Sequence, residues 1–270
     1  MQTERILRRF AGLLPVGLRS VAKRMYYRDR HWAHPALERF GTVQDLYYWT
    51  ADGTLDTLLL LQNYFSALYP GVDTETEGSV TLFDSQGGWL TTSSFKLPRN
   101  GTAKLRVSSI LRDAQIPAAG TYGTLIVHIA IPREVLALVQ DQRSVYYWDR
   151  FYIGYSNGQG QVCFVHGVDK TDIFQDGDDT PAYWYGPGGK HEWAPEMPIN
   201  IEEYARFSVV MINRSSSTKP VTLVLSDIDD KSLSWTADIP PRGAHRFQLT
   251  AEDVAELSPT ELRMRILGMP

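Results

Sequence analysis

The sequence predicts a mainly β protein: two related antiparallel β-sandwich domains in tandem, preceded by a short helical N-terminal extension. Three observations predict this fold class. One strand pattern occurs twice, apolar and polar residues alternate within its strands, and 21 Gly and 15 Pro residues supply frequent turns among the 270 residues. Short alternating strands separated by turn residues are typical of sandwiches rather than of α/β folds.

The composition excludes several classes of protein. Hydrophobic residues make up 43% of the chain and charged residues 21%, which is typical of a folded globular protein and not of a disordered chain or a coiled coil. A net charge of −4 argues against general nucleic-acid binding. The single cysteine, Cys163, excludes an internal disulfide framework and a cysteine-based zinc site, and favours a cytoplasmic location.

Residues 1–40 are predicted to form a basic amphipathic extension before the first sandwich. Residues 1–30 hold eight Lys or Arg residues against Glu4 and Asp29, with apolar residues between them at nearly helical spacing. Pro15 divides this segment, because proline removes a helical N–H donor. Three interpretations stay open: a helix pair docked on the body, an anchor that makes the protein peripheral to an anionic membrane surface, or a cleaved targeting peptide.

One strand pattern defines the two predicted sandwich domains, residues 41–140 and 141–270. In each copy an apolar strand ends in Asn, at Asn63 and Asn213, and a Val-Thr-Leu strand, an Asp-containing turn and a Pro-Arg-Gly turn follow. We interpret this ordered match as duplication of one β unit. At an offset of 142 the copies match at Gly101 and Gly243, Leu105 and Phe247, and Val107 and Leu249.

The remaining elements are predicted from local signals. Residues 145–168 are predicted to form a hairpin with its turn at 156–160, where Asn and Gly residues cluster. A short helix is predicted at 251–257, after a cap at Thr250 with Asp253 three residues on. These signals add one hairpin and little helix to the strands of the repeat.

A Tyr-Tyr-Trp triplet occurs at residues 47–49 and again at 146–148, and an acid follows each within three residues. Adjacent residues of a strand point to opposite faces, so at least one ring of each triplet is exposed or interfacial. This pattern indicates that the exposed rings of each triplet are in contact with the other sandwich, with a ligand or with another subunit. It argues against a purely solvated surface.

The segment 166–203 is the predicted recognition loop. It holds nine acidic residues against two lysines, and a cluster of aromatic residues with glycines. Aromatic rings beside carboxylates are typical of sugar binding, because a ring packs on the sugar face and a carboxylate accepts hydroxyl hydrogens. The predicted ligand-binding residues are Tyr183, Trp184, Tyr185, Trp193, Asp178, Asp179 and Glu192.

A divalent metal ion is the alternative occupant of this segment. The acids at 176–179 are hard oxygen ligands suited to Ca²⁺, although they lack the spacing of an EF-hand. A transition metal has the predicted ligands His166, Asp169 and His191. A lid whose aromatic side chains pack on the sandwich, with its acids in water, is a further interpretation that requires no cofactor.

The sequence favours a non-enzymatic binding or scaffold protein. It has none of the nucleotide-binding, zinc-protease or nucleophile-elbow motifs, and Cys163 lies in an alternating strand that is more typical of packing than of catalysis. The expected partner is a protein or a polar ligand such as a glycan, recognised through sandwich surfaces and the segment 166–203. The alternative is a carbohydrate-active or metal-dependent enzyme that uses the carboxylates of that segment. Both functions are compatible with a homo-oligomer.

The motif IPPRGAHRF at Ile239–Phe247, with the strand Ser208–Asn213 upstream, resembles the small β-sandwich of bacterial sensory-rhodopsin-transducer-like proteins. The resemblance covers only part of the chain and leaves out the N-terminal extension and the segment 166–203. It implies a bacterial β-sandwich used for recognition by a non-enzymatic binding module, and it assigns no functional residue.

Overall fold

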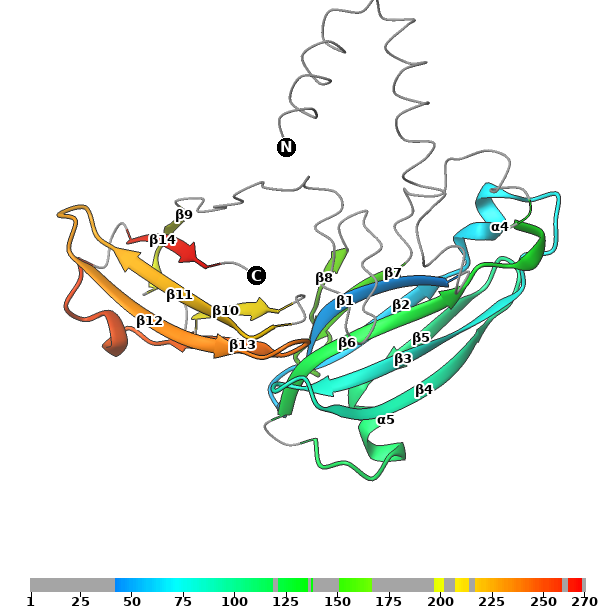
Figure 1. Cartoon of the computed structure of the whole chain (residues 1–270), viewed down its shortest axis with the longest axis horizontal. Coiled ribbons are helices and arrows are strands. Elements are labelled where there is room, and N and C mark those ends of the chain that lie inside the picture. Colours follow the sequence, from blue (N-terminus) through cyan, green and yellow to red (C-terminus); the bar gives the residue numbers. More distant parts are fainter. Residues whose placement is uncertain are drawn as a thin grey trace, which may run out of the picture.

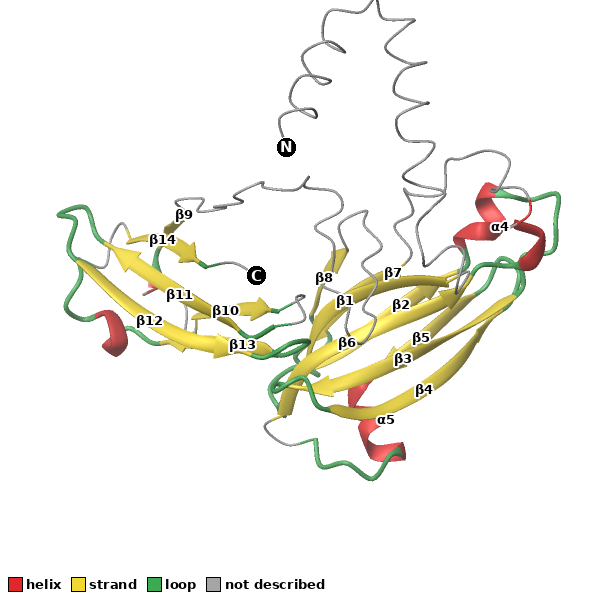
Figure 2. Cartoon of the chain, in the orientation of Figure 1, coloured by secondary structure: helices red, strands yellow, loops and turns green. Residues whose placement is uncertain are grey.

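The structure is a computed structural model, and it is mainly β, as predicted (Figure 2). Its strands form two groups, which we call the first unit (β1–β8) and the second unit (β9–β14) (Figure 1). The predicted extension at 1–40 lies outside the described residues. Those residues are 42–118, 121–135, 137, 151–166, 197–201, 207–213, 217–258 and 262–268.

The first unit is a sandwich of two antiparallel layers. One layer has the order β4-β3-β6-β1, and in the other β2 lies between β5 and β7, with β8 beyond β7. The layers are joined at the β1–β2 hairpin, where Ala51 faces Asp56. The elements are β1 (Thr42–Ala51), β2 (Asp56–Gln62), α4 (Tyr64–Leu68), β3 (Thr76–Asp84), β4 (Trp89–Leu97), β5 (Thr102–Arg106), α5 (Val107–Asp113), β6 (Thr121–Ala130), β7 (Phe151–Ser156) and β8 (Val162–His166).

The core of the first unit lies between these layers. Leu59 and Leu61 of β2 and Val80 and Leu82 of β3 belong to this core, and none of the four side chains is exposed to solvent. Alternate residues of a strand point to one face, so each of these pairs is spaced by two. Burying each such side chain stabilises the fold by roughly 1.5–3 kcal/mol before entropy is counted.

The second unit repeats this plan with fewer strands. Its layers are β12-β11-β14-β9 and the pair β10-β13, and its core includes Leu223, Leu225 and Phe247. The elements are β9 (Met197–Ile199), β10 (Phe207–Ile212), β11 (Lys219–Ser226), β12 (Ser232–Ile239), β13 (Ala244–Leu249), the 3₁₀ turn η2 (Glu252–Val254) and β14 (Leu262–Leu267).

Every strand pairing of the second unit has a counterpart in the first. β11 pairs with β12 and β14, as β3 pairs with β4 and β6. β10 pairs with β13, as β2 pairs with β5. β9 pairs with β14, as β1 pairs with β6. In register, Thr76 faces Leu97 and Lys219 faces Ile239. When the two units are aligned by this register, the Val-Thr-Leu triplet of β11 therefore lies two residues nearer the start of its strand than that of β3. A shift of two residues keeps Val and Leu of each triplet on the core face.

The Asn that ends the first apolar strand of each copy has the same role in both units. The side-chain amide of Asn63 donates to the carbonyls of Thr74, at 2.7 Å, and of Leu97, at 3.2 Å. Asn213 donates likewise to Ser217, at 2.8 Å, and to Ile239, at 2.7 Å. Both amides are buried, so each supplies side-chain donors to backbone carbonyls inside the protein.

The predicted hairpin at 145–168 is present as β7 and β8, with positive φ at Gly158 and Gly160 in its turn. Its place in the fold corrects the predicted boundary at residue 141. β7 pairs with β2, Ile153 lies opposite Leu59, and the hairpin extends the first unit instead of the second. The physical reason is that Ile153 has no exposed surface and completes the first core.

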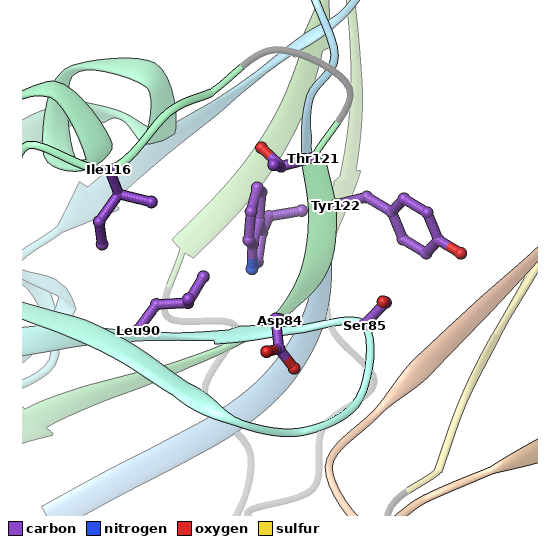
Figure 3. Close-up of a pocket in the computed structure, with 7 residues that line it drawn as sticks. Asp84, Ser85, Leu90, Ile116, Thr121 and Tyr122 are labelled. Atoms are coloured by element: carbon purple, nitrogen blue, oxygen red, sulfur yellow. The ribbon is translucent and has the colours of Figure 1, made fainter.

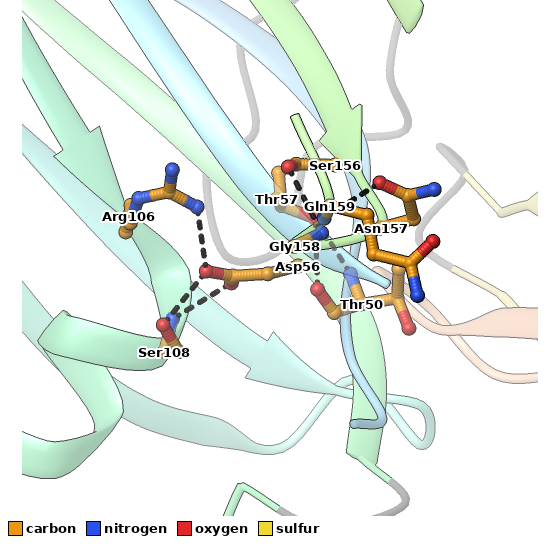
Figure 4. A network of polar contacts seen from close by, with 9 residues as sticks. All are labelled: Thr50, Asp56, Thr57, Arg106, Ser108, Ser156, Asn157, Gly158 and Gln159. Carbon is orange, nitrogen blue, oxygen red and sulfur yellow. Dashed lines mark hydrogen bonds and ion pairs between the residues drawn. The ribbon is translucent and has the colours of Figure 1, made fainter. Parts of the chain in front are cut away.

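A short helical segment follows β5 in the first unit, and another follows the equivalent strand β13 in the second. Val107, predicted to continue a strand, instead begins α5, because the Asp56 carboxylate accepts the Ser108 N–H at 3.1 Å and its hydroxyl at 2.8 Å (Figure 4). The helix predicted at 251–257 is instead the short turn η2, whose N-cap residue is Ala251 with no side-chain cap hydrogen bond. Thr250 contacts Asp253 as donor only, because the Asp253 carboxylate accepts the Thr250 N–H at 2.7 Å and the Thr250 hydroxyl at 2.8 Å. None of the helices in the described ranges is long and apolar enough to cross a membrane.

Candidate functional site

The two units meet at a junction formed by the β3–β4 turn, residues 84–88, and the β12–β13 turn, residues 240–243. The Ala244 N–H donates to the Ser85 carbonyl at 3.0 Å, so one backbone bond joins the units directly. Gly87 lies so close to Pro241 that a Cβ at Gly87 would collide with the Pro241 carbonyl. This turn therefore needs glycine for close approach as well as for its positive φ.

Arg242 contacts the first unit through its backbone and its side chain. Its carbonyl accepts the hydroxyl of Thr124, and its guanidinium lies 5.2 Å from the centre of the Phe83 ring. Arg242 adopts positive φ, as Asn100 does at the same place in the first copy. A side chain in this conformation costs about 1 kcal/mol or more, and the contacts of Arg242 across the junction offset that cost.

The apolar part of the junction is a small cluster. Leu46, Phe83 and Ile126 of the first unit are buried together, and Ile212 of β10 packs against them. These side chains lie on the face of the β4-β3-β6-β1 layer that is opposite to the sandwich core, because they alternate with Leu82 and Leu125 along their strands. The second unit thus covers apolar surface that water would otherwise contact.

Arg246 of β13 makes the polar part of the junction. Its guanidinium donates to the Asp52 carboxylate at 2.7 Å and to the Tyr48 hydroxyl at 3.4 Å, and it lies 4.8 Å from the centre of the Tyr122 ring. The ion pair is largely shielded, since 19% of the Arg246 side chain and 9% of the Asp52 side chain are exposed. Arginine suits this position because it forms a charge-assisted bond and a cation–π contact at once.

The electrostatics of Asp52 follow from these contacts. Burial alone would raise its pKa, but the N–H groups of Leu55 and Thr54 and the Arg246 guanidinium donate to the carboxylate, and together they hold the pKa below its ordinary value. Asp52 is therefore ionised at neutral pH, and the ion pair with Arg246 is intact there.

Tyr48 lies at the centre of a group of tyrosines beside this ion pair. Its ring centre is 5.9 Å from that of Tyr122 and 6.0 Å from that of Tyr155. The Tyr155 hydroxyl donates to the Tyr48 carbonyl at 3.0 Å, and burial raises the pKa of both Tyr155 and Tyr48. Both hydroxyls therefore remain protonated donors at neutral pH.

The tyrosine group confirms the prediction for the first aromatic triplet, in which one ring was expected to be exposed or interfacial. Tyr48 contacts Arg246 of the other unit, whereas Trp49 is fully buried and donates its indole N–H to the Phe83 carbonyl at 2.9 Å. The second triplet, at 146–148, lies outside the described residues.

A pocket of about 200 Å³ opens beside the junction (Figure 3). We call it the junction pocket. Leu90 and Ile116 form its apolar side, and the hydroxyl group of Thr121 and the carboxylate of Asp84 lie across from them. The buried Trp49 also contributes to the lining. Its lining residues are Trp49, Asp84, Ser85, Leu90, Ile116, Thr121 and Tyr122.

Asp84 has a structural role that the repeat makes evident. One of its carboxylate oxygens accepts the N–H groups of Gln86 and Gly88, both at 2.8 Å. Asp227 makes the same kind of turn in the second unit. The main role of Asp84 is therefore to stabilise its turn. We assign ligand recognition to the other residues that line the pocket.

The residues predicted as ligands in the segment 166–203 lie outside the described residues, except for the backbone of His166, the last residue of β8. The structure thus leaves the following predictions as they stood: Tyr183, Trp184, Tyr185, Trp193, Asp178, Asp179 and Glu192 for a ligand, and His166, Asp169 and His191 for a metal. Within the described part of the chain, no group of three or more His, Cys, Asp or Glu side chains could hold a metal ion.

The pairing of Arg246 with Asp52 could not be found in the sequence. The two residues are 194 positions apart, and only the packing of β13 against β6 and of β10 against β1 brings them together. Two signals were present: Asp52 follows the aromatic triplet three residues on, and Arg246 lies in the IPPRGAHRF motif. Neither signal identified the other residue as its partner.

No family model matches the chain, and no curated protein matches it. Among solved structures, a β-glucuronidase from glycoside hydrolase family 2 is 11% identical over 85% of this chain and 20% of that chain, with a TM-score of 0.20. The tetra-tandem repeat in the extending region of a large adhesion protein is 9% identical over 80% of this chain and 42% of that chain, with a TM-score of 0.16. At these TM-scores neither structure bears on the function of this chain, and the resemblance to sensory-rhodopsin-transducer-like proteins stays a prediction.

Proposed function

We propose that this chain is a non-enzymatic binding protein that takes a small polyhydroxylated ligand, of the size of one pyranose ring, in the junction pocket. The observation that carries the proposal is the division of the pocket wall. Leu90 and Ile116 lie on one side, and Ser85 and Thr121 bring hydroxyl groups to the other, whereas the Tyr122 ring points away from the pocket toward Arg246. A pyranose has a matching division, with C–H groups on its faces and hydroxyl groups around its rim.

The size of the pocket supports a single ring. Its volume of about 200 Å³ is below the roughly 300–1,000 Å³ of sites that enclose drug-sized ligands. A ligand with about twelve non-hydrogen atoms, each contributing about −0.3 kcal/mol, binds in the millimolar range. Weak binding of this kind is useful for recognition when several sites act together.

The junction supports a preformed pocket. The Ser85 carbonyl is held by the Ala244 N–H, and the Tyr122 ring is held by the Arg246 guanidinium. Two lining residues are therefore positioned by the second unit, which reduces the ordering cost of binding. On this proposal the two units work as one recognition body, and the segment 166–203 adds contacts beyond the pocket.

The test is saturation-transfer NMR on the whole chain with methyl glucoside, methyl galactoside and N-acetylglucosamine as separate probes. We expect transfer to at least one probe with a millimolar Kd. Leu90→Trp fills the pocket and abolishes transfer, and Ser85→Ala, which keeps the backbone bond to Ala244, weakens binding about fivefold by removing one hydroxyl partner.

The matched control is Leu233→Trp, which makes the same change at a half-buried leucine of β12 in the second unit. This variant should bind like the unmodified chain. Absence of transfer to all three probes, or transfer that persists in a folded Leu90→Trp variant, would overturn the proposal.

A further inference from the structure

β8 is an edge strand with an apolar surface. It is the last strand of its layer after β2 and β7, and in the described ranges no strand pairs with its outer edge. Val162 is 37% exposed, and Phe164 and Val165 are each 43% exposed. The side chains of Val162 and Phe164 lie over Gly154, where a Cβ would meet both of them. Apolar side chains and backbone groups are thus presented together at one edge.

The register determines which backbone groups point outward. The turn is closed by the Asn157 N–H, which donates to the Gln161 carbonyl at 3.3 Å. Hydrogen-bonded and non-hydrogen-bonded pairs alternate along an antiparallel ladder, so Phe164, which lies opposite Gly154, falls in a non-hydrogen-bonded pair. The N–H and C=O of Phe164 therefore point away from β7, as do those of Val162.

The pairing of β2 with β5, on the other side of the same layer, also indicates that the N–H and C=O of Phe164 point away from β7. The Asn63 N–H donates to the Gly101 carbonyl at 3.0 Å, which directs the N–H and C=O of Leu59 and Leu61 toward β5. Those of Leu58 then point toward β7, where Leu58 lies opposite Gly154. Gly154 thus bonds to β2, and Phe164 on its other side is left to bond outward.

Four other edge strands carry residues that usually block pairing with another chain. β4 has Lys96, β5 has Lys104, β9 has Pro198 and β12 has Asp238. In contrast, residues 151–165 contain no charged residue and no proline. Two copies of β8 can therefore approach each other without bringing like charges together.

We propose that β8 pairs antiparallel with β8 of a second copy of this chain, about a two-fold axis at Phe164. An antiparallel pair about this axis is self-complementary: Phe164 lies opposite Phe164 of the partner subunit, and Val162 lies opposite His166 of the partner subunit. The outward N–H and C=O groups of these residues form about six hydrogen bonds between the copies. The β5-β2-β7-β8 layer then continues into the second molecule. This interface is independent of the junction pocket.

The first test is sedimentation velocity of the whole chain from about 1 to 100 μM. We expect a reversible monomer–dimer equilibrium with a micromolar Kd, because the interface is small. Phe164→Lys places two cations opposite each other and raises Kd at least tenfold. Ser234→Lys, on the exposed edge of β12, is the matched control and leaves Kd unchanged. A monomer at every concentration, or a dimer that Phe164→Lys does not weaken, overturns the proposal.

The second test examines the register with the single native thiol. Cys163 is free and exposed, and the proposed pairing places it opposite Val165 of the partner subunit in a non-hydrogen-bonded pair, with Cα atoms about 4.5 Å apart. That spacing is within the range of disulfides, so Val165→Cys should give a covalent dimer on mild oxidation. Val162→Cys is the control, because its new thiol lies on the other face of the strand. Equal dimer yields from the two variants, or none from Val165→Cys, reject the proposed pairing.

Discussion

Arg246 connects the two units through a single side chain. It contacts Asp52, Tyr48 and Tyr122, all of which belong to the first unit, while its own backbone belongs to β13. Asp52 also accepts the N–H groups of Thr54 and Leu55, each at 3.0 Å. The carboxylate thus keeps its place in the β1–β2 turn without Arg246, and the arginine mainly contributes the connection between the units.

We predict that Arg246→Gln lowers the free energy of unfolding by about 2 kcal/mol, because a charge-assisted hydrogen bond and a cation–π contact are lost from a shielded site. Urea unfolding followed by tryptophan fluorescence measures this change. The control is Arg265→Gln on the exposed side of β14, for which less than about 0.5 kcal/mol is expected. Similar losses in both variants would show that Arg246 does not hold the junction.

The lowered pKa of Asp52 predicts how the stability depends on pH. A carboxyl group with a pKa lower in the folded than in the unfolded chain stabilises the fold above its unfolded pKa, and this contribution is lost as the pH falls through the folded pKa. Asp52→Asn removes the contribution. The difference in unfolding free energy between the unmodified chain and Asp52→Asn should therefore be largest at pH 7 and shrink as the pH falls below about 4, the ordinary pKa of an aspartate. A difference that stays constant with pH contradicts this account.

At the scale of the elements, the repeated asparagines show what the two copies share. Asn63 and Asn213 each tie the end of an apolar strand to carbonyls of a neighbouring turn and strand. Leucine or alanine at these positions would remove these side-chain donors from a buried place. The asparagines are therefore a requirement of the β plan itself and do not indicate a binding site.

We predict that Asn63→Ala and Asn213→Ala each lower the unfolding free energy by about 2–3 kcal/mol, since buried carbonyls lose their donors. Gln248→Ala, at an exposed position of β13, is the control and should cost under about 0.5 kcal/mol. Thermal unfolding by circular dichroism measures all three variants. If either asparagine variant matches the control, the equivalence of the two asparagines fails.

The strands of this fold could be predicted from local patterns, whereas their partners could not. Matching strands could be identified from the alternation around Leu105 and Phe247 and from the turn glycines Gly101 and Gly243. The structure confirms the match, because β5 pairs with β2 in the first unit as β13 pairs with β10 in the second. The assignment of β7 to the first unit depends on Ile153 meeting Leu59, a contact between residues far apart in sequence. No local periodicity contains that information.

At the scale of the whole molecule, the candidate site arises only where two repeats meet. Ser85, Leu90 and Tyr122 belong to three separate strands and turns of the first unit, and the second unit secures two of them through Ala244 and Arg246. The sequence directed attention to aromatic residues and acids within one segment. A site assembled from separate strands leaves no such compact signal.

The most direct test of the central claim is an amide chemical-shift map of the deuterated whole chain, titrated with the pyranose that gives the strongest saturation transfer. We expect shifts at residues 84–90 and 121–122 and at Ala244, which line or support the junction pocket. Shifts confined to the segment 166–203, or no shifts at millimolar ligand, would contradict it.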